Sequence, residues 1–221
     1  MYRAADNTLG RRSGYHGGDT TGEPPVLDER SVDPEEVGED LSEHVREVHE
    51  TDERLNNPIP LAQADAEDYD TVVFPGGHGA EWDITQDVHA RELLRESVAG
   101  DDGKALVVCH TVGILAFTRD SDGEFLVDGR SVTGFPNAWE EGIVDENDLL
   151  PDGRKLPYWV EDEVKAVGAD WDAELDADTS VTVDGDLITA RGPPSSLQPP
   201  GRFSTNWTPS SVLMYINGLD R

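Results

Sequence analysis

The chain has 221 residues, enough for one sizeable core, and it contains no run of about 18 apolar residues that would cross a membrane. Acidic residues outnumber basic residues 47 to 17, which gives a formal net charge of −30. This charge argues against nucleic acid and anionic membrane surfaces as partners, because both are polyanions. The acids are dispersed through the chain, so we interpret the charge as a solvated acidic surface adapted to a salty, halophilic cytosol.

Two further features of the sequence concern its compartment. The chain opens without a basic and then apolar signal peptide. Its one cysteine, Cys109, cannot form an internal disulfide. Both features predict a cytoplasmic protein in a reducing environment.

The predicted elements alternate between helices and short apolar strands. An exposed helix is expected over residues 34–55, with a narrow apolar stripe at Val37, Leu41, Val45 and Val48. It is followed by a strand (70–77), a helix (84–99), a strand (104–110), a helix (111–119), a strand (129–135) and a helix (156–168). Residues 180–192 then predict an antiparallel hairpin turning at Asp184-Gly185, at one edge of the sheet.

This alternation predicts an α/β fold with a mostly parallel sheet. No repeat or low-complexity linker divides the chain, so a single domain over residues 1–221 is expected, with residues 197–221 as an atypical tail. Residues 187–219 contain no Asp or Glu, unlike the acidic body. The first 18 residues contain no apolar strand, although a domain of this type usually begins with one.

Cys109 ends the apolar run "KALVV" and precedes a predicted helix. A lone cysteine in such a run is more often a small buried hydrophobe than a nucleophile. Its position at a strand-to-helix turn favours the nucleophile, because a helix N-terminus lowers the pKa of a thiol. The carboxyl ends of parallel strands are also where ligands bind in open α/β sheets.

A second turn of this kind, "FPGGHGAEWD", lies one strand and helix earlier. Gly76 and Gly77 allow backbone N–H groups to face inward, as an oxyanion hole requires. The two turns are expected to share one edge of the sheet. The predicted oxyanion and substrate-binding residues are therefore Gly76, Gly77 and His78.

His110 is a candidate general base, although adjacent residues on a turn seldom point at each other. A carboxylate from elsewhere is expected to orient it, and Glu140 and Glu141 follow the next strand. No spacing typical of metal ligands is present. His44 and His49 are five apart, and His78, Glu81 and Asp83 match no rule, so no metal site is predicted.

Four segments, in order and spacing, resemble the ThiJ/PfpI (DJ-1-like) superfamily: "VVFPGGHGAEWD", "ALVVCHTVGILAF", "SVTGFPNAWEE" and "LPYWVEDEVKAVGADW". They are most similar to its heat-shock chaperone and glyoxalase III branch. "GEPPVLDERSVD" and "LITARGPPSS" are similar to two further segments of that branch, so the resemblance covers about residues 14–196.

The resemblance implies a flavodoxin-like α/β sandwich related to class I glutamine amidotransferases, as a homodimer. It implies Cys109 as nucleophile, His110 as its partner, Glu140 as the acid with Glu141 as the near alternative, and an oxyanion hole from Gly77 and the backbone of His110. The implied reaction uses no cofactor and converts a small aldehyde, methylglyoxal, to D-lactate through a cysteine hemithioacetal.

Several departures leave alternatives open. The family's first strand, which ends in a glutamate beside the cysteine, has no counterpart near the start of this sequence, and Glu23 lies too late to replace it. The tail stands where a final helix is expected, and "CHTVGILAF" lacks the usual proline and alanine. A truncated gene model or an inactive paralogue would explain these departures. A stress-response holdase, a cysteine redox sensor and an amidase or peptidase remain alternative functions.

Overall fold

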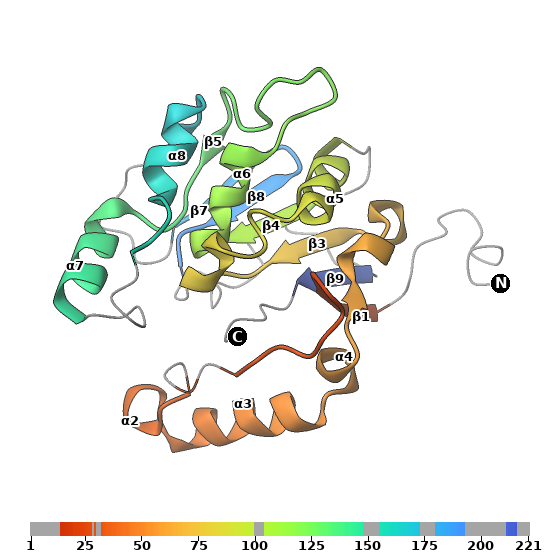
Figure 1. Cartoon of the computed structure of the whole chain (residues 1–221), viewed down its shortest axis with the longest axis vertical. Coiled ribbons are helices and arrows are strands. Elements are labelled where there is room, and N and C mark those ends of the chain that lie inside the picture. The colour runs from red at the N-terminus through yellow and green to blue at the C-terminus, as the bar shows by residue number, and fades with distance from the viewer. Residues whose placement is uncertain are drawn as a thin grey trace.

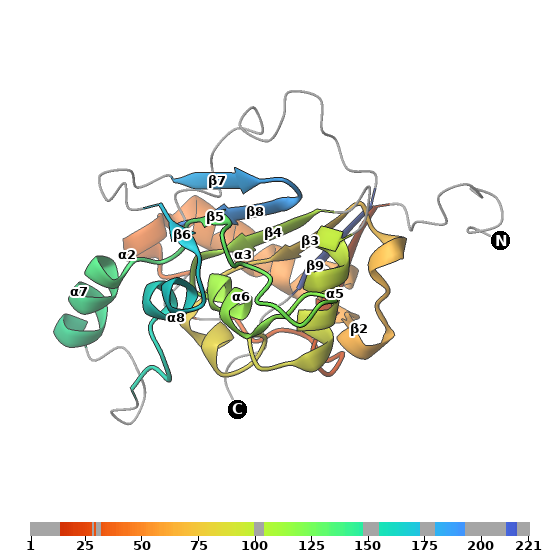
Figure 2. The same ribbon diagram turned by 90° about the horizontal axis from the view of Figure 1, so that it is seen from above.

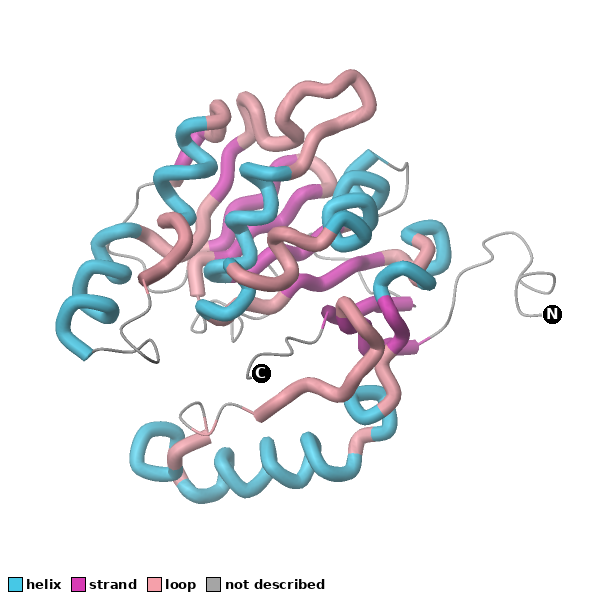
Figure 3. Tube along the Cα trace, in the orientation of Figure 1, coloured by secondary structure: helices cyan, strands magenta, loops and turns pink. Residues whose placement is uncertain are grey.

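The computed structural model describes residues 14–27, 29, 32–99, 104–147, 155–172, 180–192 and 211–215. Most of its strands form one twisted layer with helices outside it (Figure 3). Seven strands make this sheet, in the order β2-β1-β9-β3-β4-β8-β7. In chain order they are β1 (Gly14–Asp19), β2 (Ile59–Pro60), β3 (Thr71–Phe74), β4 (Ala105–Val108), β7 (Val181–Asp184), β8 (Leu187–Ala190) and β9 (Ser211–Tyr215).

The strands pair in parallel except for β7 and β8, which form the predicted hairpin at one edge (Figure 2). Its two-residue loop is Gly185-Asp186, one residue later than predicted, because Asp184 still pairs with Leu187. Gly185 takes a φ of 61°, which explains why a glycine stands there. The mostly parallel α/β architecture is as the alternation of elements predicts.

Strand β9 lies inside the sheet, hydrogen-bonded in parallel to β1 on one side and β3 on the other. Flavodoxin-like sheets have the order 2-1-3-4-5, so β9 takes the place that the first strand of a chain takes in that order. Part of the predicted tail is therefore a central strand. Strand β1 forms from "GYHGGD" without an apolar run, a strand that the apolar pattern does not predict.

Helices α5 (Val88–Ala99), α6 (Ile114–Phe117) and α8 (Val160–Ala166) cover one face of the sheet (Figures 1 and 2). The main core lies between them and β3, β4 and β8, and includes the fully buried Phe74, Leu94, Ile114 and Leu115. Short 3₁₀ helices fill the connections: η1 (Leu61–Gln63), η2 (Ala66–Asp68), η3 (His78–Glu81) and η4 (Cys109–Gly113). None of the helices in the described ranges is long and apolar enough to cross a bilayer.

Two predicted elements differ in detail. The strand expected over 129–135 is only β5 (Ser131–Val132), which pairs with β6 (Asp170–Trp171) in a separate two-stranded sheet and is followed by α7 (Asn137–Asn147). The helix expected over 34–55 is divided into α2 (Pro34–Val37), α3 (Glu39–Thr51) and α4 (Glu53–Asn56). Leu41, predicted in its apolar stripe, is 51% exposed, and the buried residue of α3 is Ser42.

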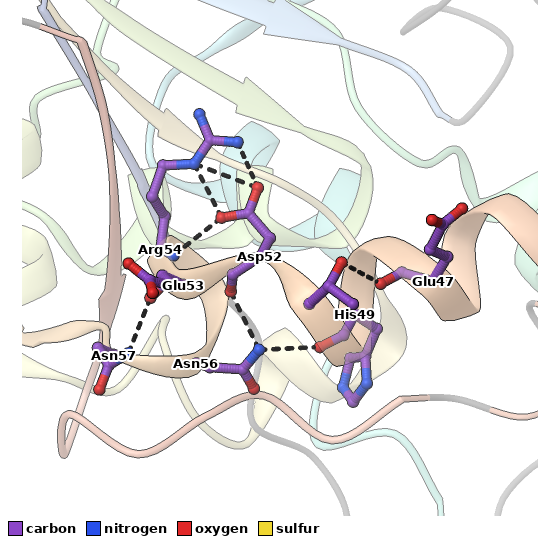
Figure 4. A network of polar contacts seen from close by, with 8 residues as sticks. Glu47, His49, Asp52, Glu53, Arg54, Asn56 and Asn57 are labelled. Carbon is purple, nitrogen blue, oxygen red and sulfur yellow. Dashed lines mark hydrogen bonds and ion pairs between the residues drawn. The ribbon is translucent and has the colours of Figure 1, made fainter.

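The break between α3 and α4 is held by local polar contacts (Figure 4). Asp52 caps α4 by accepting from the backbone N–H of Arg54, and it also pairs with the Arg54 guanidinium. The side-chain amide of Asn56 donates to the carbonyls of His49 and Asp52 at 3.1 and 3.0 Å. These contacts use residues that favour caps over helix interiors, which explains why the charged segment is not one long helix.

Candidate active site

Cys109 lies directly after β4, as the first residue of η4, and is 5% exposed. Its φ of 62° is the only positive value at a non-glycine residue among those described. A left-handed conformation at a cysteine costs about 1–3 kcal/mol, and such strain is typical of a nucleophile on a sharp strand-to-helix turn. The geometry therefore matches the predicted elbow.

The predicted glycine turn lies directly against the cysteine. Strands β3 and β4 are parallel neighbours, with Val72 opposite Ala105, so their carboxyl ends meet at one edge. A Cβ placed on Gly76 would lie 2.3 Å from the Cβ of Cys109 and 3.1 Å from its Sγ, so only glycine fits there. The hydroxyl of Thr111 donates to the carbonyl of Pro75 at 2.6 Å and fixes the two turns to each other.

The backbone N–H groups of His110 and Gly77 lie near the sulfur of Cys109 and act to lower the pKa of its thiol. They are the two donors that the resemblance implies for an oxyanion hole. Burial nevertheless raises the pKa of the Cys109 thiol to about 12. The expectation that the turn lowers this pKa is therefore wrong, because desolvation of the thiolate outweighs the lowering effect of these two backbone groups. A thiolate would form at neutral pH only with a neighbouring base to take the proton.

His110 connects the thiol to a carboxylate. Its Nδ1 lies 3.2 Å from the Sγ of Cys109, so these adjacent side chains do point at each other, contrary to the usual geometry of a turn. Its Nε2 lies 2.8 Å from Oε2 of Glu140. The imidazole is 1% exposed, and burial lowers its pKa, which leaves it neutral and able to accept a proton.

Glu140 and Glu141 are neighbours on α7, but their side chains lie in different environments. Glu140 points inward and is 3% exposed, whereas Glu141 is exposed to solvent. Burial by itself raises the pKa of Glu140, but the hydrogen bonds from His110 and His78 together have the larger effect and lower this pKa to about 2. The structure thus brings Glu140, not Glu141, to His110 and keeps it ionised.

The side chain of His78 has a contact that sequence reasoning missed. Its Nε2 lies 3.0 Å from Oε1 of Glu140, so this carboxylate holds two histidines. The ring centroids of His78 and His110 lie 3.9 Å apart. Phe135 stacks on the ring of His110 with the centroids 4.3 Å apart. No local pattern predicts this contact, since the two partners lie 62 residues apart in the chain.

Glu81 is a second buried acid beside the site. It is 1% exposed, and neither carboxylate oxygen has a hydrogen-bond partner among the described residues. Burial, and next the charge of Glu140, raise its pKa to about 9. Glu81 is therefore a neutral carboxylic acid at pH 7. A glutamate in so acidic a chain gives no signal of this state.

Comparisons with known proteins agree with this geometry. The model of the DJ-1/PfpI family matches residues 19–198. The glutathione-independent glyoxalase HSP31 of Saccharomyces cerevisiae is 31% identical over 137 residues, which cover 61% of this chain and 56% of that protein. The chain thus spans little more than half the length of this curated relative.

Two solved structures share the fold. Glyoxalase III from Candida albicans superposes with a TM-score of 0.63 at 26% identity, over 77% of this chain and 71% of that one. Rapid Encystment Protein 24 kDa from Francisella tularensis superposes with a TM-score of 0.61 at 25% identity, over 79% of this chain and 73% of that one. These likenesses confirm the predicted flavodoxin-like, glutamine amidotransferase-like fold. The chain belongs to the DJ-1/PfpI family.

Proposed function

We propose that the protein is a cofactor-independent glyoxalase of the glyoxalase III type, which converts methylglyoxal and water to D-lactate. The observation that carries this proposal is the line of contacts from the Sγ of Cys109 through His110 to Glu140, beside two inward backbone N–H groups. The similarity to the yeast glyoxalase and to the Candida glyoxalase III supports the same chemistry.

In this mechanism His110 takes the thiol proton at Nδ1 as the sulfur adds to the aldehyde carbon of methylglyoxal. Glu140 stabilises the imidazolium that forms. The N–H groups of Gly77 and His110 stabilise the alkoxide oxygen of the hemithioacetal. A proton then moves from the former aldehyde carbon to the neighbouring carbon, and the imidazolium of His110 returns its proton to the oxygen on that carbon, which gives a lactoyl thioester. Water hydrolyses the thioester to lactate and the free thiol.

The environment of Cys109 favours this role over that of a redox sensor. Sensor cysteines are exposed and have a low pKa, whereas this thiol is 5% exposed and has a pKa of about 12. A protonated thiol beside a neutral histidine is suited to activation by a base when substrate is bound. The homodimer and the holdase activity stay predictions that light scattering and client-aggregation assays would test.

The deciding experiment is D-lactate formation from methylglyoxal without glutathione, in concentrated KCl. Cys109→Ser and Cys109→Ala are expected to abolish it while circular dichroism shows a folded chain. His44→Ala, an exposed histidine on α3, serves as control and is expected to keep the wild-type rate. Turnover that survives in both cysteine variants would rule out the thiol mechanism. Suppressed client aggregation in those variants, without turnover in the wild type, would indicate a holdase.

A further inference from the structure

His78, His110 and Glu140 form a cluster of three metal-ligating side chains. Within the described part of the chain, one ligand atom from each lies within 4.8 Å of the others. Oε1 and Oε2 of Glu140 lie 3.0 and 2.8 Å from the Nε2 atoms of His78 and His110. We propose that these three residues form a zinc site, and that Zn²⁺ bound there reversibly inhibits the enzyme.

The donor set fits Zn²⁺ better than Mg²⁺ or Ca²⁺. Two imidazole nitrogens and one carboxylate occur in Zn²⁺ sites that keep a fourth position open, whereas Mg²⁺ and Ca²⁺ prefer oxygen ligands. The three ligands come from three segments, η3, η4 and α7, which explains why no sequence spacing predicts the site.

Access and rigidity both suit a reversible ligand. The side chain of His78 is 28% exposed, while those of His110 and Glu140 are 2% and 4% exposed. An ion therefore reaches the cluster past His78. Phe135 stacks on the ring of His110 with 26° between the planes and holds that ligand in place.

The charge of the cluster favours a cation. Among the described residues, the ion-pair partners of the Glu140 carboxylate are the two histidines, and no lysine or arginine is paired with it. A carboxylate this buried gains from a dication, because the surrounding apolar groups screen the attraction weakly.

Inhibition follows from the tautomer of His110, and this step rests on the proposed function. When Zn²⁺ occupies Nε2, the proton of the neutral ring sits on Nδ1, which faces the Sγ of Cys109 at 3.2 Å. Nδ1 then has no lone pair to accept the thiol proton. No net proton is taken up or released by the ring, and chelation of the zinc restores the base.

The binding test uses chelator-treated protein in concentrated KCl, titrated with Zn²⁺ in competition with a chromophoric chelator. One Zn²⁺ per chain is expected. His78→Ala and Glu140→Gln should each weaken binding by at least about tenfold, while Cys109→Ser keeps it. His44→Ala is the control, because His44 lies beside Asp40, Glu43 and Glu47 on α3, a cluster of ionisable groups outside the proposed site. Unchanged affinity in His78→Ala, or loss in His44→Ala, would overturn the site.

A second measurement identifies the ligands. Co²⁺ in the site should give visible d–d bands without a sulfur-to-cobalt charge-transfer band, and the d–d bands should weaken in His78→Ala. A charge-transfer band would make Cys109 a ligand and overturn this set of ligands.

The inhibitory role is tested by turnover. If the wild type forms D-lactate, Zn²⁺ should inhibit this activity and a chelator should restore it. Tight binding without inhibition would overturn the inhibitory role. If the wild type forms no D-lactate but binds Zn²⁺ and the variants weaken binding as expected, the proposed function is refuted and the zinc site is supported.

Discussion

The thiol of Cys109, the ring of His110 and the carboxylate of Glu140 lie in one buried line of contacts. The three groups differ in their protonation states. The thiol is protonated because burial raises its pKa to about 12, the histidine is neutral, and the carboxylate is ionised because two histidines lower its pKa to about 2. In the proposed reaction the histidine is therefore already able to accept a proton, and the thiolate forms only as the substrate reacts.

Glu140→Gln should lower the rate of D-lactate formation by about 100-fold or more, since a neutral amide does not stabilise the imidazolium of His110. The matched control is Glu141→Gln, one residue along the same helix and exposed, which should keep the wild-type rate. Steady-state kinetics of the two variants make the comparison. Equal losses, or a loss only in Glu141→Gln, would contradict the orientation of α7.

Glu81 gives a prediction about stability and pH. Its folded pKa of about 9 lies above its ordinary value of 4.5. Between these values the folded chain holds a proton that the unfolded chain has lost, so this group makes stability fall as pH rises, by up to about 1.4 kcal/mol per pH unit. Below the ordinary pKa both states are protonated and the effect disappears.

Glu81→Gln removes this titration and should therefore gain stability relative to the wild type as pH rises from 6 to 8. Urea unfolding at a series of pH values measures the difference. The control is Glu124→Gln, the same substitution at an exposed glutamate. A difference between Glu81→Gln and the wild type that does not change with pH would show that the Glu81 carboxylate is ionised in the folded protein.

At the scale of elements, the site is the meeting of two strand-to-helix turns. The ends of β3 and β4 are neighbours because the strands are parallel and adjacent, and α7 supplies the carboxylate from a third segment. Gly76 allows the first turn to lie against Cys109. The ring of His110, next to Cys109, stacks on Phe135 and lies 3.9 Å from the tilted ring of His78.

Gly76→Ala should destabilise the fold by about 1–3 kcal/mol and abolish turnover, because its Cβ would meet that of Cys109 at 2.3 Å. Gly142→Ala, on α7, is the control, since a Cβ there meets nothing within 4 Å and alanine favours a helix. Denaturant unfolding and D-lactate assays of both variants give the comparison. A fully active Gly76→Ala would mean that the two turns lie farther apart.

At the scale of the whole molecule, the sheet is completed by a segment from the far end of the described chain. Strand β9 pairs Ser211 with Gly14 in β1 and Val212 with Thr71 in β3. Without it, β1 and β2 would be separated from β3, β4 and β8. Strand β9 thus takes the position that the first strand has in the flavodoxin order, and residues 211–215 contain no glutamate.

Leu213→Pro tests this arrangement, because proline removes a backbone donor and does not fit a central strand. The variant should lose its cooperative thermal transition or show a strongly lowered Tm, with faster proteolysis. Leu213→Ile keeps the donor and suits a strand, so it should stay close to the wild type. If both variants melted like the wild type, residues 211–215 would not pair with β1 and β3.

Local patterns by themselves determined the fold class, the hairpin and the two turns that form the elbow. Apolar runs, glycine pairs and the Cys-His dipeptide act over a few residues, so their conformations follow from the sequence nearby. The helix over 34–55 was predicted less well, because Gly38 and Asp52 end its segments by capping contacts that compete with the helical stripe.

Only the tertiary structure decided which acid meets His110, what His78 contacts, and where the last strand lies. The first two depend on contacts across 30 and 62 residues, and the third on pairing between Gly14 and Ser211. The same holds for the pKa of Cys109, since the turn predicts a lowered value and burial raises it. Burial and long-range pairing are properties of the packed molecule, and no pattern along the chain records them.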